Sequence, residues 1–133
     1  MAIPEWPSTH PWFAEAAELL SNSRLQSISY RNQLEQILQE TRRDVRQVDW
    51  RHQVPRLLSE ALEHVKVQRA LEENTRVSAY DLDHLPGSDE AQQVASLLRL
   101  VDECFSQRLK LHCLLMQARS VFLDEQLRQC FGG

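Results

Sequence analysis

The last third of the chain, residues 90–131, repeats apolar side chains at helical intervals and contains neither proline nor glycine. Residues three and four positions apart lie on one face of a helix, so the pattern predicts an amphipathic helix of about 40 residues. Leu100, Leu114 and Met116 widen this face beyond the seam between two helices, so we expect more than one helical neighbour. The main apolar residues are Val94, Leu97, Leu98, Val101, Phe105, Leu109, Leu111, Leu115, Phe122, Leu123 and Leu127.

The preceding sequence predicts two more helical segments. The first covers about 11–53, because Pro11 is tolerated in a first helical turn and apolar residues then recur at helical intervals. Pro55 removes a backbone hydrogen bond and predicts either a kink or the start of a new helix. The second segment covers 56–73, and Tyr80 and Leu82 are compatible with an extension to about 83. Residues 21–29, SNSRLQSIS, are expected to be a weak point of the first helix, since serine competes with the backbone for hydrogen bonds.

Two segments are predicted to lie outside the helices. Residues 84–89 contain Pro86-Gly87, a strong turn signal, and Ser88 or Asp89 is suited to cap the helix that follows. Residues 1–10 predict an extended lead-in rich in proline and tryptophan. We expect residues 11–133 to form a single helical unit. The predicted fold class is all-α, either a long antiparallel helical hairpin or an elongated three-helix bundle with coiled-coil character.

Length and charge narrow the classes of function. The 133 residues amount to one domain, and the net charge of -4 is made of interspersed signs that favour neither nucleic acid nor an anionic membrane. No run approaches the roughly 20 apolar residues that span a bilayer. We therefore expect a cytoplasmic protein, with the nucleus also open, and neither a membrane nor a nucleic-acid partner.

Motifs that carry enzyme chemistry are missing from the sequence. There is no glycine-rich phosphate loop, no CxxC pair and no pair of histidines at helical spacing with an acid between them. His112 and Cys113 are adjacent, so on a helix they point about 100° apart and cannot share a ligand. We interpret Cys104 and Cys113 as reduced, buried structural thiols. The sequence predicts no enzyme activity, no cofactor and no metal site.

Large aromatic residues gather at the start of the chain. Trp6, Trp12 and Phe13 have rings that bury about 150–250 Å² each and are enriched at the centres of interfaces. Two interpretations are open: the rings dock on another chain, or they fold back over the chain's own apolar face. We include these three, with Trp50 and Phe105, among the predicted partner-binding residues.

Basic residues surround Trp50 in the stretch 40–52, ETRRDVRQVDWRH. Arg42, Arg43 and Arg46 have planar guanidinium groups that suit contacts with an acidic surface. Asp44 neutralises part of this charge, so a solvated face with local ion pairs is the other interpretation. We predict the three arginines as polar contacts to a partner.

Several short matches give a family resemblance. IPEW, residues 3–6, resembles the start that precedes the first helix of tektins, the filament proteins of ciliary and flagellar doublet microtubules. Glu40-Thr41, Asp44-Val45, Trp50-Arg51 and VKVQRALE, residues 65–72, resemble later parts of the same family. The resemblance implies a rod-like structural protein on the microtubule wall, located in the cytoskeleton or cilium, with tubulin or the microtubule lattice as a partner.

The sequence therefore predicts a non-catalytic structural or scaffold subunit. It would act through helix–helix contacts with other helical proteins or with itself, in a cytoskeletal assembly if the resemblance holds. The alternative is a compact helical adaptor module that binds an acidic partner protein through its arginines. An independently folded bundle would bring Trp50 close to the last helix, whereas the arms of a rod would not fold over.

Overall fold

The computed structural model describes residues 11–82 and 88–132. The described residues form three long helices and one short 3-10 helix, and they contain no strand. The elements are α1 (Pro11–Arg43), η1 (Val45–Gln47), α2 (Gln53–Leu82) and α3 (Ser88–Phe131). The all-α prediction is confirmed.

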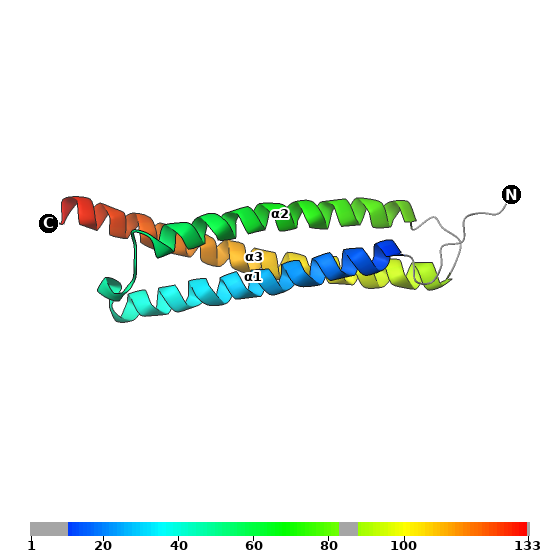
Figure 1. Ribbon diagram of the computed structural model, residues 1–133, viewed down its shortest axis with the longest axis horizontal. Coiled ribbons are helices and arrows are strands. Elements are labelled where there is room, and N and C mark those ends of the chain that lie inside the picture. The colour runs from blue at the N-terminus through cyan, green and yellow to red at the C-terminus, as the bar shows by residue number, and fades with distance from the viewer. Residues whose placement is uncertain (1–10, 83–87, 133) are drawn as a thin grey trace.

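The three helices lie side by side in an elongated bundle (Figure 1). The α2 helix returns antiparallel to α1, and α3 then runs in the same direction as α1. With 44 residues, α3 is the longest element and extends for about 66 Å. Of the two arrangements that the sequence left open, the chain adopts the three-helix bundle.

Each helix turns residues spaced alternately three and four apart toward the core, the spacing of a coiled coil. The fully or nearly buried members of this series, which are three, four or seven residues apart, are Phe13, Ala16, Leu20, Ser27, Leu34 and Ile37 on α1, and Val94, Leu97, Val101, Cys104, Leu111, Leu115 and Ala118 on α3. The coiled-coil character is therefore present in both helices.

The apolar core has two parts. One cluster joins the start of α1 to the first half of α3 and the end of α2; its buried residues are Phe13, Ala16, Leu20, Ala79, Val94, Leu97, Val101 and Cys104. The other joins the opposite end of the bundle; its buried residues are Leu34, Ile37, Leu38, Val48, Trp50, Val54, Leu57, Ala61, Val65, Leu111, Leu115 and Ala118. The space between the two clusters is occupied by polar side chains.

The break between the first two helices lies earlier than predicted. The first helix was expected to reach residue 53, but α1 ends at Arg43 and the chain reverses over residues 44–52. Two aspartates stabilise this reversal. Asp44 Oδ1 accepts the backbone N–H two residues later (3.0 Å), and Asp49 Oδ1 accepts the N–H groups two and three residues later (3.2 and 3.0 Å). These backbone hydrogen bonds lower the pKa of both carboxyl groups.

Pro55 lies at the start of a new helix, α2, and does not kink a continuous one. It is the third residue of α2, within the first turn, where a helix does not need its amide proton. The extension of this helix is confirmed, since α2 continues to Leu82. The first helix begins at Pro11 as predicted, and α3 begins at Ser88, two residues before the predicted start. The predicted lead-in over 1–10 and most of the predicted turn over 84–89 lie outside the described residues.

Candidate functional site

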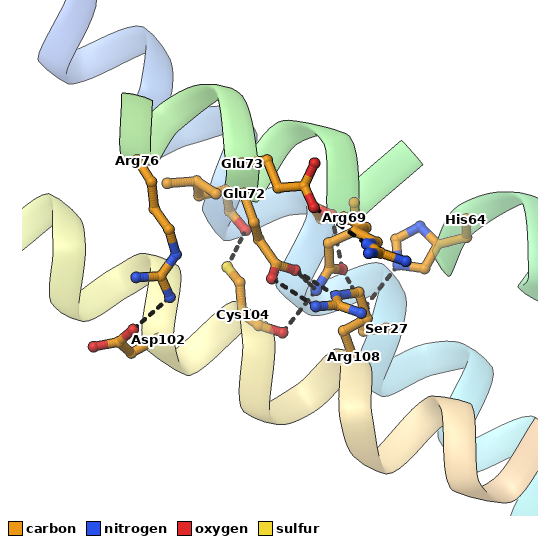
Figure 2. Close-up of polar contacts among 12 residues, drawn as sticks. Ser27, His64, Arg69, Glu72, Glu73, Arg76, Asp102, Cys104 and Arg108 are labelled. Carbon is orange, nitrogen blue, oxygen red and sulfur yellow. Dashed lines mark hydrogen bonds and ion pairs between the residues drawn. The ribbon is translucent and has the colours of Figure 1, made fainter. Parts of the chain in front are cut away.

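Polar side chains from all three helices meet between the two apolar clusters. We call Ser23, Ser27, His64, Gln68, Glu72 and Arg108 the polar layer, part of which is labelled in Figure 2. Ser27 and Gln68 are fully buried, and Glu72 is 3% exposed. A buried polar group costs free energy unless its hydrogen bonds are made. The value of this layer therefore depends on how completely its members are paired.

Gln68 of α2 is the centre of the polar layer. Its Oε1 accepts hydrogen bonds from the hydroxyl groups of Ser23 (2.9 Å) and Ser27. Its Nε2 donates to Glu72 Oε2 (3.0 Å) and to the backbone carbonyl of Cys104 (2.7 Å). A glutamine amide offers two donors and two acceptor positions, so this one is fully used. Because the partners come from α1, α2 and α3, sliding one helix along another would leave buried polar atoms unpaired.

His64 donates the hydrogen bond that joins it to α1. Its Nε2 lies 2.7 Å from Ser27 Oγ. The single hydroxyl proton of Ser27 is already donated to Gln68, so the imidazole must supply the proton of this second bond. Burial lowers the pKa of His64, against a smaller opposite effect of a hydrogen bond with Gln68. The bundle therefore holds a neutral imidazole protonated on Nε2.

We expect the stability of the bundle to fall as the pH is lowered from 7 to about 5.5. Unfolded His64 takes up a proton near its ordinary pKa of 6.5, whereas burial lowers the pKa of the folded imidazole, which therefore takes up a proton less readily. The unfolded state then binds more protons, and the free energy of unfolding falls by at most about 1.4 kcal/mol per pH unit from this group. Urea unfolding at several pH values measures the slope. His64→Gln should reduce it and the exposed His112→Gln should not; equal slopes in wild type and His64→Gln would contradict the assignment.

Glu72 and Arg108 form a buried ion pair across α2 and α3. Arg108 Nε lies 2.9 Å from Glu72 Oε2, and the second guanidinium nitrogen lies 3.2 Å from Oε1. The exposed fractions of the two side chains are 4% for Glu72 and 15% for Arg108. The guanidinium carbon also lies 5.0 Å from the ring centroid of Phe105. This two-point contact fixes both the position and the orientation of α3 beside α2.

Weaker polar pairs surround the layer at the surface and join the same helices. They are Arg24 with Glu103 (2.6 Å), Arg31 with Gln107 (2.7 Å) and Arg76 with Asp102 (2.7 Å). Figure 2 shows the last of these beside the buried residues. Exposed pairs contribute little stability each, so their main effect is to favour the same register as the polar layer.

The polar layer contains a serine beside a histidine, a combination that can act as nucleophile and base. Here Ser27 is fully buried and His64 is 8% exposed. The serine hydroxyl also donates to Gln68, away from the imidazole. The burial of Ser27 and His64 leaves a substrate no access to the serine hydroxyl. The two side chains instead contribute to a fixed pattern of hydrogen bonds between helices.

The predicted aromatic anchors are mostly used inside the bundle. Phe13 is 8% exposed, and the half-buried Trp12 ring packs edge-on against it at 5.2 Å between centroids. Trp50 is 5% exposed, donates from Nε1 to the Val45 carbonyl (2.9 Å) and stacks on Phe122 of α3. The docking prediction is corrected for Phe13 and Trp50, because each ring is needed to fill the chain's own core. Trp6 lies outside the described residues.

The predicted arginines lie at the corner between α1 and η1. Arg42, Arg43 and Arg46 are exposed. Arg46 forms an ion pair with Asp44 (3.2 Å), so the prediction of local ion pairs applies to it. The side chains of Arg42 and Arg43, at the end of α1, form no hydrogen bond or ion pair with another described residue. Phe105, 44% exposed on α3, has one face toward Arg108, and it keeps the most accessible surface of the aromatic anchors that lie among the described residues.

The cysteines divide into two kinds. Cys104 is buried and its thiol donates to the Leu20 carbonyl (3.2 Å). Burial and the nearby Glu72 carboxylate raise the pKa of this thiol to about 11, so it stays protonated. Cys113 is exposed, so the expectation that it is a buried structural thiol is wrong; Cys130 is exposed as well. Within the described part of the chain, no group of three or more histidine, cysteine or acidic residues is placed to hold a metal ion.

Sequence reasoning missed the polar layer because it followed apolar residues only. The missed signal is a polar residue at a seven-residue spacing within a series of core residues. Ser27 lies seven residues after Leu20 and seven before Leu34, all three of them fully buried. On α3, Arg108 holds the same kind of position between Val101 and Leu115. Ser23 and Ser27 of the segment 21–29 therefore contribute to the polar layer, and the segment is continuous helix.

No protein-family model matches this chain, and neither does any curated protein or any solved structure at a significant level. The resemblance to tektins therefore stays a prediction. Within the described ranges, no helix combines the length and the apolar character that crossing a membrane requires.

Proposed function

We propose that this chain is a non-catalytic structural subunit that acts through helix–helix contacts made by α3. The observation that carries the proposal is a row of exposed, uncharged residues on the outer side of α3. We call this row the outer stripe: Leu109, Cys113, Met116, Ser120, Leu123, Leu127 and Cys130. Its members are spaced alternately four and three apart over 22 residues, the spacing by which one helix packs on another.

The outer stripe differs from the exposed surface of the neighbouring helix. On α2 the exposed apolar residues Val67, Val77 and Tyr80 alternate with charged ones, among them Arg56, Glu63, Lys66 and Glu73, so charge interrupts the exposed face along the length of that helix. On α3, Leu109 and Leu123 are both 48% exposed and Leu127 is 56% exposed, after α3 has already supplied its core residues to the bundle. Met116 and Leu123 also line a groove between α2 and α3. An apolar row of this length on a folded chain is typical of an interaction surface.

The polar layer supports the same proposal. A subunit that positions other chains has to present its contact surface at a fixed place along a rigid body. The hydrogen bonds of Gln68 and the Glu72–Arg108 pair hold α3 in one register against α1 and α2. The outer stripe is therefore presented at a defined height along the bundle.

Photo-crosslinking tests this proposal in cells. A photoreactive residue replaces Met116 in the outer stripe, and a matched control replaces Ala70, which is exposed on α2. We expect position 116 to give adducts whose peptides map to helical segments, either of this chain or of another protein, and position 70 to give few. Adducts of equal amount at both positions, or none at 116, would contradict a role for the stripe.

The same experiment separates two finer proposals. A cytoskeletal setting, which rests on the resemblance to tektins, requires adducts at 116 with tubulin or a filament protein. The adaptor function is the second candidate, and it is supported by the exposed, unpaired side chains of Arg42 and Arg43. It requires strong adducts with an acidic protein when the photoreactive residue replaces Arg42.

A further inference from the structure

We propose that the outer stripe binds a second copy of this chain, forming a parallel, in-register two-stranded coiled coil between the two α3 helices. This inference rests on the proposed function, because it names the partner of the same surface. In such a pair, Leu109, Met116, Leu123 and Cys130 form one set of seam positions. Cys113, Ser120 and Leu127 form the other set. No seam position carries a charge, so two stripes can face each other without burying one.

The charges beside the stripe favour a second copy in parallel orientation. In parallel coiled coils, the residue just before one seam position faces the residue five places later on the other chain. Arg119 precedes Ser120, and five places later the residue is Asp124, so each Arg119 would face Asp124 of the other copy. Both residues are exposed, and neither forms an ion pair within the described part of the chain. A symmetric dimer makes this contact twice.

The antiparallel alternative does not use these charges. When two stripes run in opposite directions with Cys113 opposite Cys130, Leu123 lies opposite Ser120. The residues flanking the seam then pair Arg119 with glutamine instead of Asp124. The parallel arrangement therefore gives Arg119 and Asp124 partners of opposite charge, whereas the antiparallel one leaves both without such a partner.

The length of the surface is also sufficient for association. Seven seam positions over 22 residues correspond to three heptads, or about 31 Å of helix. Residues at the end of α3 add to the exposed apolar area, since Phe131 is 85% exposed. The bundle supplies a helix that is already ordered, so the dimer does not bear the cost of folding it.

The cysteines provide a readout of orientation. Identical seam residues face each other in a parallel pair, at a separation of the order that a disulfide requires, roughly 4.4 to 6.8 Å between Cα atoms. With oxidised glutathione as oxidant, two thiols lose two protons and two electrons, and two molecules of reduced glutathione leave. The parallel dimer predicts Cys130–Cys130 and Cys113–Cys113 links between chains. The antiparallel dimer predicts Cys113–Cys130 links, which mass spectrometry distinguishes.

The test uses the purified full chain in light scattering and sedimentation, followed by disulfide mapping. We expect a dimer, links between like cysteines, and a dissociation constant at least about a hundredfold larger for Leu123→Glu, which opposes two carboxylates in the seam. Gln39→Glu, on the exposed face of α1, is the matched control and should leave the dimer unchanged. Circular dichroism checks that Leu123→Glu stays helical, as expected for a residue that is 48% exposed in the bundle.

Charge reversal tests the orientation independently. Arg119→Asp and Asp124→Arg should each weaken the dimer about tenfold, and the double variant should restore it. A monomer at high concentration, links between Cys113 and Cys130, or a dimer indifferent to Leu123→Glu would overturn the inference. If the purified chain is monomeric while position 116 still crosslinks to a helix of another protein, the self-pairing fails and the proposed function stands.

Discussion

Arg108→Met should lower the free energy of unfolding by about 3 to 5 kcal/mol, the largest stability loss we expect from a single polar substitution in this chain. Methionine retains the length and apolar stem of the side chain but removes the charge that faces Glu72. The Glu72 carboxylate is then left with one hydrogen bond, from Gln68, at a site that is 3% exposed. An uncompensated buried charge costs far more than the ion pair contributes. Urea unfolding followed by circular dichroism measures the loss.

Two further variants separate the buried charge from other effects. Arg69→Met removes an arginine on the same helix as Glu72, but its ion pair with Glu73 is exposed, so we expect a loss below about 1 kcal/mol. The double variant Glu72→Met with Arg108→Met removes both charges and should recover most of the stability. A loss below 1 kcal/mol for Arg108→Met alone, or no recovery in the double variant, would show that the pair is not a buried, mutually dependent unit.

The energetic balance explains what such a layer contributes. Apolar residues at these positions would bury more hydrophobic surface and need no partners, so the layer is not required for stability. Apolar core residues at seven-residue spacing can interlock again after one helix slides by a heptad, which brings alternative registers closer in energy. A polar layer removes this degeneracy, since only one register pairs Gln68 and Glu72 with all their partners. A single polar core position is known to set register in coiled coils.

The all-α fold followed from local patterns in the sequence. Helical spacing of apolar residues, few glycines, and the tolerated position of Pro11 depend on neighbours within one or two turns. The start of α1 at Pro11 is therefore predicted correctly, and of the two ends that the sequence left open for the second helix, the structure has the later one, at Leu82. The position of the break between the first two helices was predicted wrongly, because the prediction relied on Pro55 alone, whereas α1 already ends at Arg43.

The reversal at 44–52 depends on contacts that the local pattern does not contain. Asp44 and Asp49 accept hydrogen bonds from backbone N–H groups in this reversal, but an aspartate in the sequence does not by itself distinguish such a turn from an exposed position on a helix. Trp50 is drawn inward by a stacking contact with Phe122, which lies 72 positions later in the chain. The sequence around Trp50 shows only the neighbouring arginines and not this contact, so the tryptophan was interpreted as a surface anchor. Its place in the core becomes evident only when the third helix is present.

The polar layer depends on the three helices together. Ser27 and Gln68 are unremarkable in their own helices, and each could have been an exposed polar residue. They are buried because the core-facing sides of α1, α2 and α3 meet at the same height along the bundle. Heptad positions counted on every helix, including polar residues, would have placed Ser27 and Arg108 in the core. The pairing of Ser27 with Gln68, and of Arg108 with Glu72, would still have required the register of the helices.

The central claim is that the polar layer selects one register of the bundle, and distances between spin labels test it most directly. Labels are attached at Asn32→Cys on α1 and Ala70→Cys on α2, both exposed, with Cys113 and Cys130 changed to serine. Labelled chain is diluted with unlabelled chain so that only distances within one molecule are measured. We expect one narrow distance distribution for the natural layer.

The comparison is a chain with an apolar layer: Ser27→Ala, His64→Leu, Gln68→Leu, Glu72→Leu and Arg108→Leu. We expect it to remain helical and at least as stable, but to give a broad or multiple distance distribution, with registers separated by about 10 Å, the rise of seven helical residues. An unchanged narrow distribution in the apolar variant would contradict the claim, because packing alone would then be sufficient to align the three helices.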